Sequence, residues 1–146
     1  MIDLRIIQND ELAPVYSWDN PEESWDAYRA ALSTPRWTHY GVFEERKLEA
    51  CISCELIAPA FVGIHVTKRK GGIAHEMLRD VIVALGKTLF EGGISTIWCR
   101  VAQANAPALR LVAACGMERV AESEMETVWE LKAETYFANP EKWNGN

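Results

Sequence analysis

Apolar and polar residues alternate at the start of the chain and then change to a helical spacing. Residues 2–6 alternate strictly, which predicts a half-buried first strand. A short helix is expected over residues 10–18. An Asn-Pro-Glu-Glu sequence that begins at Asn20 predicts the start of a second helix, with Asn20 as its N-cap, and Pro35 ends that helix.

Strand-like runs dominate the middle of the chain. Residues 40–45 and 48–56 flank a short polar turn and predict a β-hairpin, and residues 60–66 predict a further strand. The remaining expected elements are a helix from the glycines at 71 and 72 to about residue 90, a strand over 95–101, a helix over 105–115 and a closing strand pair over 117–121 and 126–132. This order predicts one mixed α/β domain over residues 1–146, with residues 133–146 as a C-terminal tail.

Composition and charge narrow the class of partner. Apolar residues make up 49% of the chain and charged residues 25%, as in ordinary globular proteins, and the formal net charge is −6. An acidic chain is a poor match for nucleic acids or anionic membranes, which need clustered Lys and Arg. No apolar run approaches the ~18 residues of a membrane span. We therefore expect a cytoplasmic protein with neither a nucleic-acid nor a membrane partner.

Four cysteines stand at positions 51, 54, 99 and 115. Cys51 and Cys54 form a C-x-x-C pattern, but it lies in an expected strand, where residues three apart face opposite sides. A second pair that would complete a zinc site is missing from the sequence. We expect buried free thiols, with a metal site and redox chemistry as the alternatives, and no metal centre is predicted.

The most informative segment joins the expected strand over 60–66 to the long helix. Three cations, Lys68, Arg69 and Lys70, precede Gly71 and Gly72. Glycine lets backbone come close to a ligand, and the first amides of a helix attract anions. The pattern favours a phosphate site, with a solvated basic loop as the alternative. It has neither the P-loop spacing nor the dinucleotide-binding fingerprint.

Two blocks of sequence resemble one protein family. Arg69-Lys70-Gly71-Gly72-Ile73-Ala74 is similar to the Gln/Arg-x-x-Gly-x-Gly/Ala signature of the GNAT superfamily of acyl-CoA-dependent N-acyltransferases. The stretch from Asn105 to Met117 resembles that family's Asn-x-x-Ala helix, which ends in Gly-Phe. The resemblance covers nearly the whole chain. It implies a mixed, mostly antiparallel sheet with helices on both faces and splayed central strands.

The resemblance also implies a cofactor site for acetyl-CoA as co-substrate. The strand over 62–66 would pair its backbone with pantetheine, and the glycine loop would surround the pyrophosphate. Asn105 would contact the cofactor, although a helix N-cap is the alternative. The implied cofactor-binding residues are Gly63, Ile64, Val66, Arg69, Lys70, Gly71, Gly72, Ile73, Ala74 and Asn105. Gly72→Asp is then expected to weaken CoA binding with little effect on thermal stability.

The chain departs from the family at the positions where catalytic residues are usual. Seven residues after Asn105, where many members have Tyr, stands Val112, and five residues before it, where some have Glu, stands Arg100. His65 and Glu55 are weak substitute candidates for the base, because both flank the expected cleft and can accept a proton. Solvated side chains without a catalytic role, and a water chain to bulk solvent, are the alternatives.

The leading hypothesis is an N-acetyltransferase that moves an acetyl group to a primary amine of a small molecule or a protein. A homodimer is expected from the resemblance. One alternative is a non-catalytic CoA-binding or structural module of the kind that also occurs in bacteriophage genomes. A second alternative is a protein-interaction domain that uses the Trp-rich first third, which contains Trp18, Trp25 and Trp37.

Overall fold

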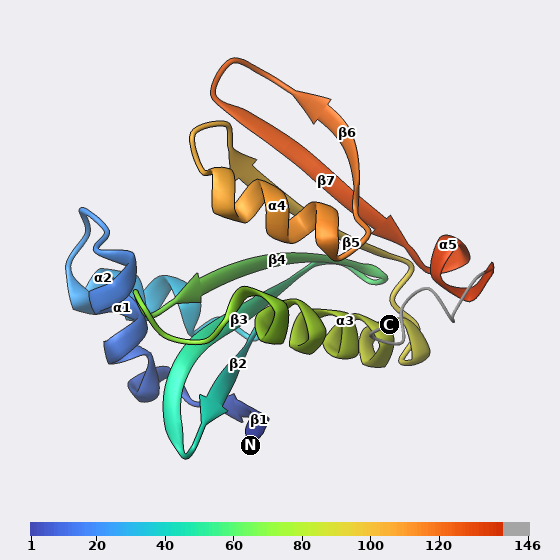
Figure 1. Cartoon of the computed structure of the whole chain (residues 1–146). Helices are drawn as coiled ribbons and strands as arrows, with labels where there is room; N and C mark the ends of the chain where they lie inside the picture. Colours follow the sequence, from blue (N-terminus) through green and yellow to red (C-terminus); the bar gives the residue numbers. More distant parts are fainter. Residues whose placement is uncertain (139–146) are drawn as a thin grey trace. The chain divides into compact units, whose positions relative to one another are not determined.

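The computed structural model describes residues 1–138 (Figure 1). Its elements are β1 (Ile2–Ile7), the 3-10 helix η1 (Asn9–Leu12), α1 (Ala13–Asp19), α2 (Trp25–Leu32), β2 (Trp37–Glu44), β3 (Lys47–Ala58), β4 (Phe61–Lys68), α3 (His75–Glu91), β5 (Thr96–Ala102), α4 (Ala106–Ala114), β6 (Glu118–Glu122), β7 (Glu126–Lys132) and α5 (Ala133–Ala138). Over this part of the chain the strands form a seven-stranded sheet in the order β1-β2-β3-β4-β5-β7-β6. β4 and β5 run parallel, whereas β1/β2, β2/β3, β5/β7 and β6/β7 are antiparallel. The predicted mixed, mostly antiparallel α/β fold is confirmed.

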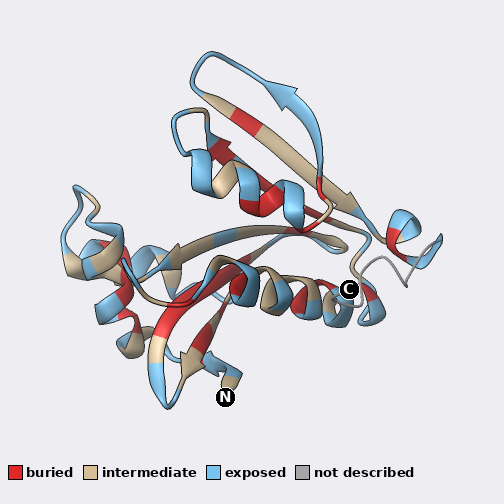
Figure 2. Ribbon diagram, in the orientation of Figure 1, coloured by how far each residue is buried: buried red, intermediate tan, exposed pale blue. Residues whose placement is uncertain are grey.

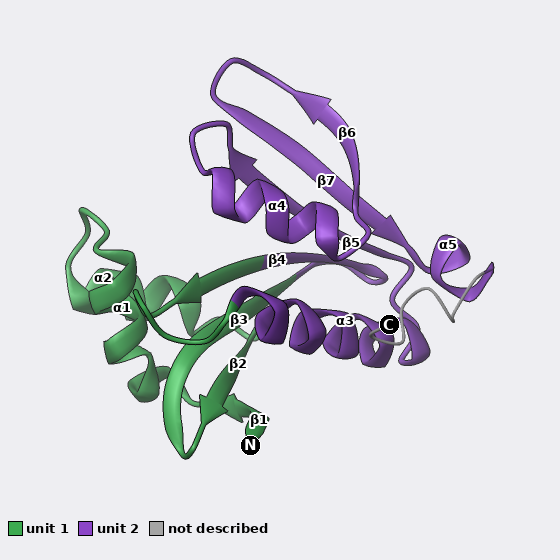
Figure 3. Ribbon diagram, in the orientation of Figure 1, with its two compact units in different colours: residues 1–55, 65–74 green, residues 56–64, 75–146 purple. Residues whose placement is uncertain are grey.

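The described chain divides into two compact units (Figure 3). Unit 1 contains Met1–Glu55 and His65–Ala74, and unit 2 contains Leu56–Ile64 and the chain from His75 onward. The boundary therefore crosses β3 and β4, and the glycine loop belongs to unit 1.

Unit 1 is built on the antiparallel strands β1, β2 and β3. β2 and β3 are joined by Glu45 and Arg46, which have φ values of 51° and 69°. Two successive positive φ values define a type I′ turn, whose twist matches that of the flanking strands. The predicted hairpin is confirmed, although the turn lacks the Asn-Gly pair that usually marks this type.

The core of unit 1 lies between this sheet and the N-terminal helices. Its buried cluster consists of Ile7, Leu12, Val15 and Cys51, and the partly buried side chains packed against it include Trp18 and Trp25. Tyr16 lies 5.6 Å from Trp25 and 5.1 Å from Tyr28, measured between ring centroids. Trp18 and Trp25 are thus partly buried against the core, which counts against a surface that uses them for partner binding.

The second helix begins later than the sequence predicts. Asn20 is the C-cap of α1, in the left-handed region at φ 47°, and its amide donates to the Tyr16 carbonyl. Asn tolerates this conformation better than most residues, which is why it can end a helix as well as start one. The N-cap of α2 is Ser24, whose hydroxyl accepts from the Ala27 amide. The prediction of an Asn20 N-cap is therefore wrong.

β3 is buried over six of its twelve residues, residues 49–54, and it carries a red segment in Figure 2. Both Cys51 and Cys54 are buried, although residues three apart on a strand face opposite sides. All four cysteines are free and buried, as predicted. Burial raises the pKa of the Cys51 thiol to about 11 and those of the other three to about 12. Such thiols stay protonated at neutral pH, which disfavours metal binding and redox chemistry.

Unit 2 contains the parallel pair β4/β5 and the antiparallel strands β5, β7 and β6. β4 pairs with β5 from Phe61↔Thr96 to Gly63↔Trp98, and the register goes no further although β4 runs on to Lys68. β5 pairs with β7 along its whole length, from Thr96↔Lys132 to Ala102↔Glu126. The end of β4/β5 pairing at Gly63 agrees with the splayed central strands that were expected.

The C-terminal tail begins with structure. Residues Ala133–Ala138 form α5, where the buried Tyr136 lies 5.4 Å from Phe90 between ring centroids. The rest of the predicted tail lies outside the described residues. Among residues 1–138, no helix combines the length and the apolar character that crossing a membrane requires.

Candidate functional site

The glycine loop after β4 is a tight turn that is held by hydrogen bonds at both ends. The Arg69 carbonyl accepts from the Gly72 amide at 3.0 Å, and Gly71 has φ +73° between them. A type II turn needs a positive φ at this third residue, which glycine supplies without strain. Lys68 Nζ donates to the Ile73 carbonyl at 3.1 Å and links the two ends of the loop.

Four amides of this loop lack a protein partner. Within residues 1–138, no acceptor meets the N–H groups of Lys70, Gly71, Ile73 or Ala74. The chain then passes directly into α3, whose first-turn amides also have no acceptor inside the helix. Unpaired donors close together along the chain are what an anion such as a pyrophosphate requires.

The two glycines serve different purposes. A Cβ on Gly71 would meet nothing within 4 Å, so its requirement is conformational. A Cβ on Gly72 would lie 2.5 Å from Glu49 Oε2 and 3.0 Å from the Arg69 carbonyl oxygen, so any other residue there requires Glu49 to shift. The open side at Gly71 and the free amides are compatible with a phosphate group approaching the backbone.

Arg69 is held by the protein. Its Nε donates to Glu49 Oε2 at 2.7 Å and its Nη2 to Glu49 Oε1 at 3.0 Å. The Glu49 carboxyl, which is 5% exposed, has a pKa below its ordinary value chiefly because of these hydrogen bonds. Sequence reasoning missed Glu49. The signal was a carboxylate inside the apolar run of a buried strand.

The predicted pantetheine-binding residues lie where β4 stops pairing with β5. Gly63 is the last paired residue, so Ile64 and Val66 lie on β4 beyond that pairing. A Cβ on Gly63 would lie 3.1 Å from Trp98 Nε1. Trp98 Nε1 and His75 Nε2 are buried without a hydrogen-bond partner in the described part of the chain.

Asn105 caps α4. Its side-chain oxygen accepts from the Ala108 amide at 3.2 Å, and Pro107 occupies the first turn. The N-cap alternative is thereby confirmed, and a cofactor contact by Asn105 stays a prediction.

Solved structures resemble this chain over nearly its whole length. A mutant form of the spermidine N-acetyltransferase from Vibrio cholerae matches with a TM-score of 0.81 at 13% identity, covering 95% of this chain and 98% of the other. The ribosomal-protein-S18-alanine N-acetyltransferase from Escherichia coli matches at 0.77 and 15%, covering 91% and 94%. An aminoglycoside acetyltransferase in complex with coenzyme A matches at 0.76 and 14%, covering 96% and 99%. This chain has the GNAT fold.

Comparisons of the amino-acid sequence alone find no match. No protein-family model matches the chain, and no curated protein is similar to it in sequence. The GNAT fold is therefore recognised through its structure and the two short sequence blocks.

The two candidates for the base differ in their surroundings. Glu55 forms an ion pair with Arg36, with Nε and Oε2 3.0 Å apart. His65 is exposed on β4, and within residues 1–138 its ring has no hydrogen-bond partner. The free imidazole can accept a proton from an incoming group, whereas the Glu55 carboxylate already has a cation beside it.

The two positions that carry catalytic residues in many GNAT proteins are occupied by other side chains. Val112 is buried on α4, with 9% of its surface exposed. Arg100 is exposed on β5, and its guanidinium carbon lies 5.3 Å from the centre of the Trp98 ring. Neither side chain can act as a general acid or base near neutral pH, because Val has no proton to give and Arg stays charged.

One buried histidine has a structural role. His39 Nε2 lies 2.9 Å from the Leu32 carbonyl, so the proton sits on Nε2, and Nδ1 accepts from Ser53 Oγ at 2.8 Å. Burial lowers the pKa of His39, and the Leu32 hydrogen bond partly opposes this. Over the described residues, no group of three or more His, Cys, Asp or Glu is arranged to bind a metal ion.

Proposed function

We propose that this protein is an N-acyltransferase that moves an acetyl group from acetyl-CoA to a primary amine. The observation that carries the proposal is the glycine loop on a GNAT fold, with the amides of Lys70, Gly71, Ile73 and Ala74 free to bind the pyrophosphate. The β4 backbone beyond Gly63, which has no β5 partner, would receive the pantetheine arm.

The reaction proceeds by direct attack. The amine nitrogen bonds to the acetyl carbonyl carbon, the carbon–sulfur bond breaks, and the electron pair leaves with the CoA sulfur. The amine loses one proton, for which His65 is the proposed acceptor because its ring is exposed and unpaired among the described residues. Backbone amides of β4 would stabilise the oxygen anion of the tetrahedral intermediate.

Two observations support a proposal for the class of acceptor. The matched structures include acetyltransferases named for spermidine and for aminoglycosides, and both kinds of compound carry several amino groups. The net charge of −6 favours a cationic acceptor over an anionic one. We therefore place small polyamines first among acceptors, followed by amines of proteins.

A direct test uses binding and turnover together. Isothermal titration with acetyl-CoA should give saturable one-site binding, and a panel of spermidine, an aminoglycoside and an alanine-terminated peptide should reveal release of CoA thiol. Absence of acetyl-CoA binding would refute the proposal.

A second candidate function is supported by Val112 and Arg100. They occupy the two positions at which other GNAT proteins have catalytic residues. Under it the chain binds CoA without catalysis. Tight acetyl-CoA binding with no transfer above the uncatalysed rate from pH 7 to 9.5 would decide for this candidate.

We also infer that the protein forms a homodimer through β6. This strand is at the edge of the sheet, all five of its residues are exposed, as Figure 2 shows in pale blue, and Val120 is 48% exposed. An open edge with exposed apolar side chains is suited to pairing with a second strand. Light scattering at micromolar concentration should give twice the monomer mass, and Val120→Lys should lower it.

A further inference from the structure

Glu49 is a buried carboxylate near the start of β3. It is 5% exposed, and the other buried polar side chains of the described residues are His39, Ser53 and Thr127. A carboxylate that leaves water loses its hydration, and this cost is offset only if a partner replaces the water. Its presence in this strand therefore needs an explanation in terms of what it holds.

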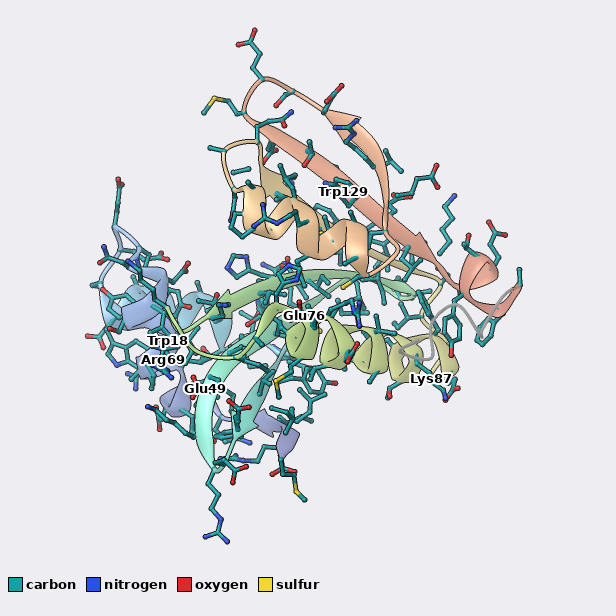
Figure 4. The ribbon with its side chains drawn as sticks, in the orientation of Figure 1. Trp18, Glu49, Arg69, Glu76, Lys87 and Trp129 are labelled. Atoms are coloured by element: carbon teal, nitrogen blue, oxygen red, sulfur yellow. The ribbon has the colours of Figure 1, made fainter. Side chains whose placement is uncertain are left out.

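Glu49 holds one residue of the glycine loop by three hydrogen bonds. The Arg69 guanidinium makes a two-pronged contact with both carboxylate oxygens, at 2.7 and 3.0 Å, and the Arg69 amide donates to the Glu49 carbonyl at 2.9 Å. Figure 4 labels both side chains, Glu49 on β3 and Arg69 at the start of the loop. A two-pronged contact fixes the orientation of the guanidinium as well as its position.

Arg69 is also the residue that closes the turn. Its carbonyl accepts the Gly72 amide at 3.0 Å. Because the amide and the side chain of Arg69 are both bound to Glu49, the carbonyl that defines the turn is fixed from the strand. The carboxylate also lies against Gly72, where an added Cβ would come within 2.5 Å of Oε2. Glu49 thus packs against the turn and holds it by hydrogen bonds.

This arrangement changes the role expected for the basic run. The Arg69 guanidinium faces a carboxylate, and Lys68 is engaged with the Ile73 carbonyl. Lys70 is exposed and can meet an anion directly. The loop therefore offers a ligand mainly backbone amides, and these are useful only if the turn keeps its shape.

We propose that Glu49 is a positioning residue for the acyl-CoA pyrophosphate, acting through Arg69 to hold the amides of the 69–74 turn in place. This inference rests on the proposed function. It predicts an effect opposite in sign to simple electrostatics. Removing the Glu49 charge makes the loop more positive, which should favour an anion, yet the proposal requires that CoA binds less well.

Four proteins make the comparison: wild type, Glu49→Gln, Arg69→Gln and the double variant. CoA affinity is measured by titration for each. Glu49→Gln should weaken binding about tenfold, and Arg69→Gln should weaken it more, because it also leaves a bare carboxylate under the turn. The double variant should bind no worse than Arg69→Gln, since the two residues act as one unit.

A matched control is Glu11→Gln. Glu11 pairs with Arg5 at 3.3 Å in the same unit, so this variant removes a carboxylate of the same charge from an Arg partner that is not part of the loop. Its CoA affinity should stay within about twofold of wild type. Dephospho-CoA, which keeps the pyrophosphate and lacks the 3′-phosphate, should lose the same factor as CoA in Glu49→Gln.

Amide hydrogen exchange on the unliganded protein supplies a readout that needs no cofactor. Glu49→Gln should speed exchange at Gly72, whose amide closes the turn, about tenfold or more, with β5 and β7 amides unchanged. If wild type fails to bind CoA, the proposed function is refuted. Exchange at the Gly72 amide then still tests whether Glu49 holds the turn in place. The double variant has no unpaired charge, so it provides the same exchange measurement if Glu49→Gln does not fold.

Three results would overturn the inference. A higher CoA affinity in Glu49→Gln would show that the carboxylate only keeps Arg69 from binding the phosphate. Losses that add in the double variant would show that Arg69 binds the ligand independently. An exchange rate at the Gly72 amide of Glu49→Gln equal to that of wild type would show that the turn keeps its shape without Glu49.

Discussion

The glycine loop and the positions where chemistry is expected are built in different ways. In the loop, Glu49, Arg69 and Gly72 are joined by short contacts, and the result is a turn with free amides. At the positions of chemistry, Val112 is a buried apolar side chain and His65 is an exposed ring with no partner in the described residues. Under the proposed function, binding rests on backbone that is held in place, and catalysis rests on one exposed side chain.

The contrast suggests that binding and turnover can be separated by substitution. A fixed set of amides stabilises an anion whether or not a base is present, whereas proton transfer depends on one group at one place. Changes at the loop should act on affinity, and changes at His65 should act on rate.

The largest effect is expected at His65. His65→Gln keeps a polar side chain of similar size and removes the proton acceptor, so kcat should fall about 100-fold or more. CoA affinity by titration should be unchanged, because the substitution leaves the loop intact. Glu55→Gln is the comparison variant, since its carboxylate is already paired with Arg36. A kcat that drops in Glu55→Gln and not in His65→Gln would reverse the assignment of the base.

Gly72→Asp comes next. CoA affinity should fall at least tenfold, about 1.4 kcal/mol, because the new carboxylate meets the pyrophosphate. The structure adds a second effect that the sequence did not suggest. A Cβ there would lie 2.5 Å from Glu49 Oε2, and a second carboxylate would face the first, so the melting temperature should fall as well. A normal melting temperature would mean that Glu49 moves aside easily.

Much of this could be predicted from the sequence because it depends on local pattern. The existence of β1, the turn glycines and the Asn105 cap each follow from residues close in the chain. The buried face of β1 was predicted wrongly, because Ile6 is 56% exposed and Ile7 is buried in its place. The fold class also followed, because two short blocks and the element order agree with one family.

What could not be predicted depends on contacts between distant residues. Glu49 and Arg69 are twenty residues apart and meet only once β3 and the loop are packed together. The same limit explains the error at Asn20, where Ser24 provides the cap and Asn20 adopts a left-handed conformation that its sequence allows but does not require. Sequence reasoning leaves the base as a choice among His65, Glu55 and a water chain to bulk solvent.

A smaller effect concerns the pH dependence of stability in unit 1. Burial lowers the pKa of His39 below 6.5, so its contribution to stability is present above pH 6.5 and is lost as the pH falls below it. The pKa of Glu49 is below 4.5, so its contribution is lost only as the pH falls below that value. Wild type should therefore lose free energy of unfolding from pH 6.5 to 5.5, by at most about 1.4 kcal/mol per pH unit.

His39→Gln separates these two windows. The variant should be less stable at pH 7.5, because the hydrogen bonds to Leu32 and Ser53 are disturbed, but its stability should change little from pH 6.5 to 5.5. Urea denaturation at each pH measures both quantities. A wild-type slope in the variant would assign this window to a different group.

The smallest effect distinguishes the two glycines of the loop. Gly71 needs a positive φ but has space for a side chain, since a Cβ there would meet nothing within 4 Å. Gly71→Ala should therefore cost about 1 kcal/mol of unfolding free energy through backbone strain alone. Gly71→Asn should cost less, because Asn enters the left-handed region more readily. Gly72→Ala should cost more than either, because its Cβ meets Glu49, and it should also speed exchange at its own amide. An equal loss of unfolding free energy for Ala at both positions would show that backbone strain sets the requirement for glycine throughout the turn. Contact with Glu49 would then play no part in it.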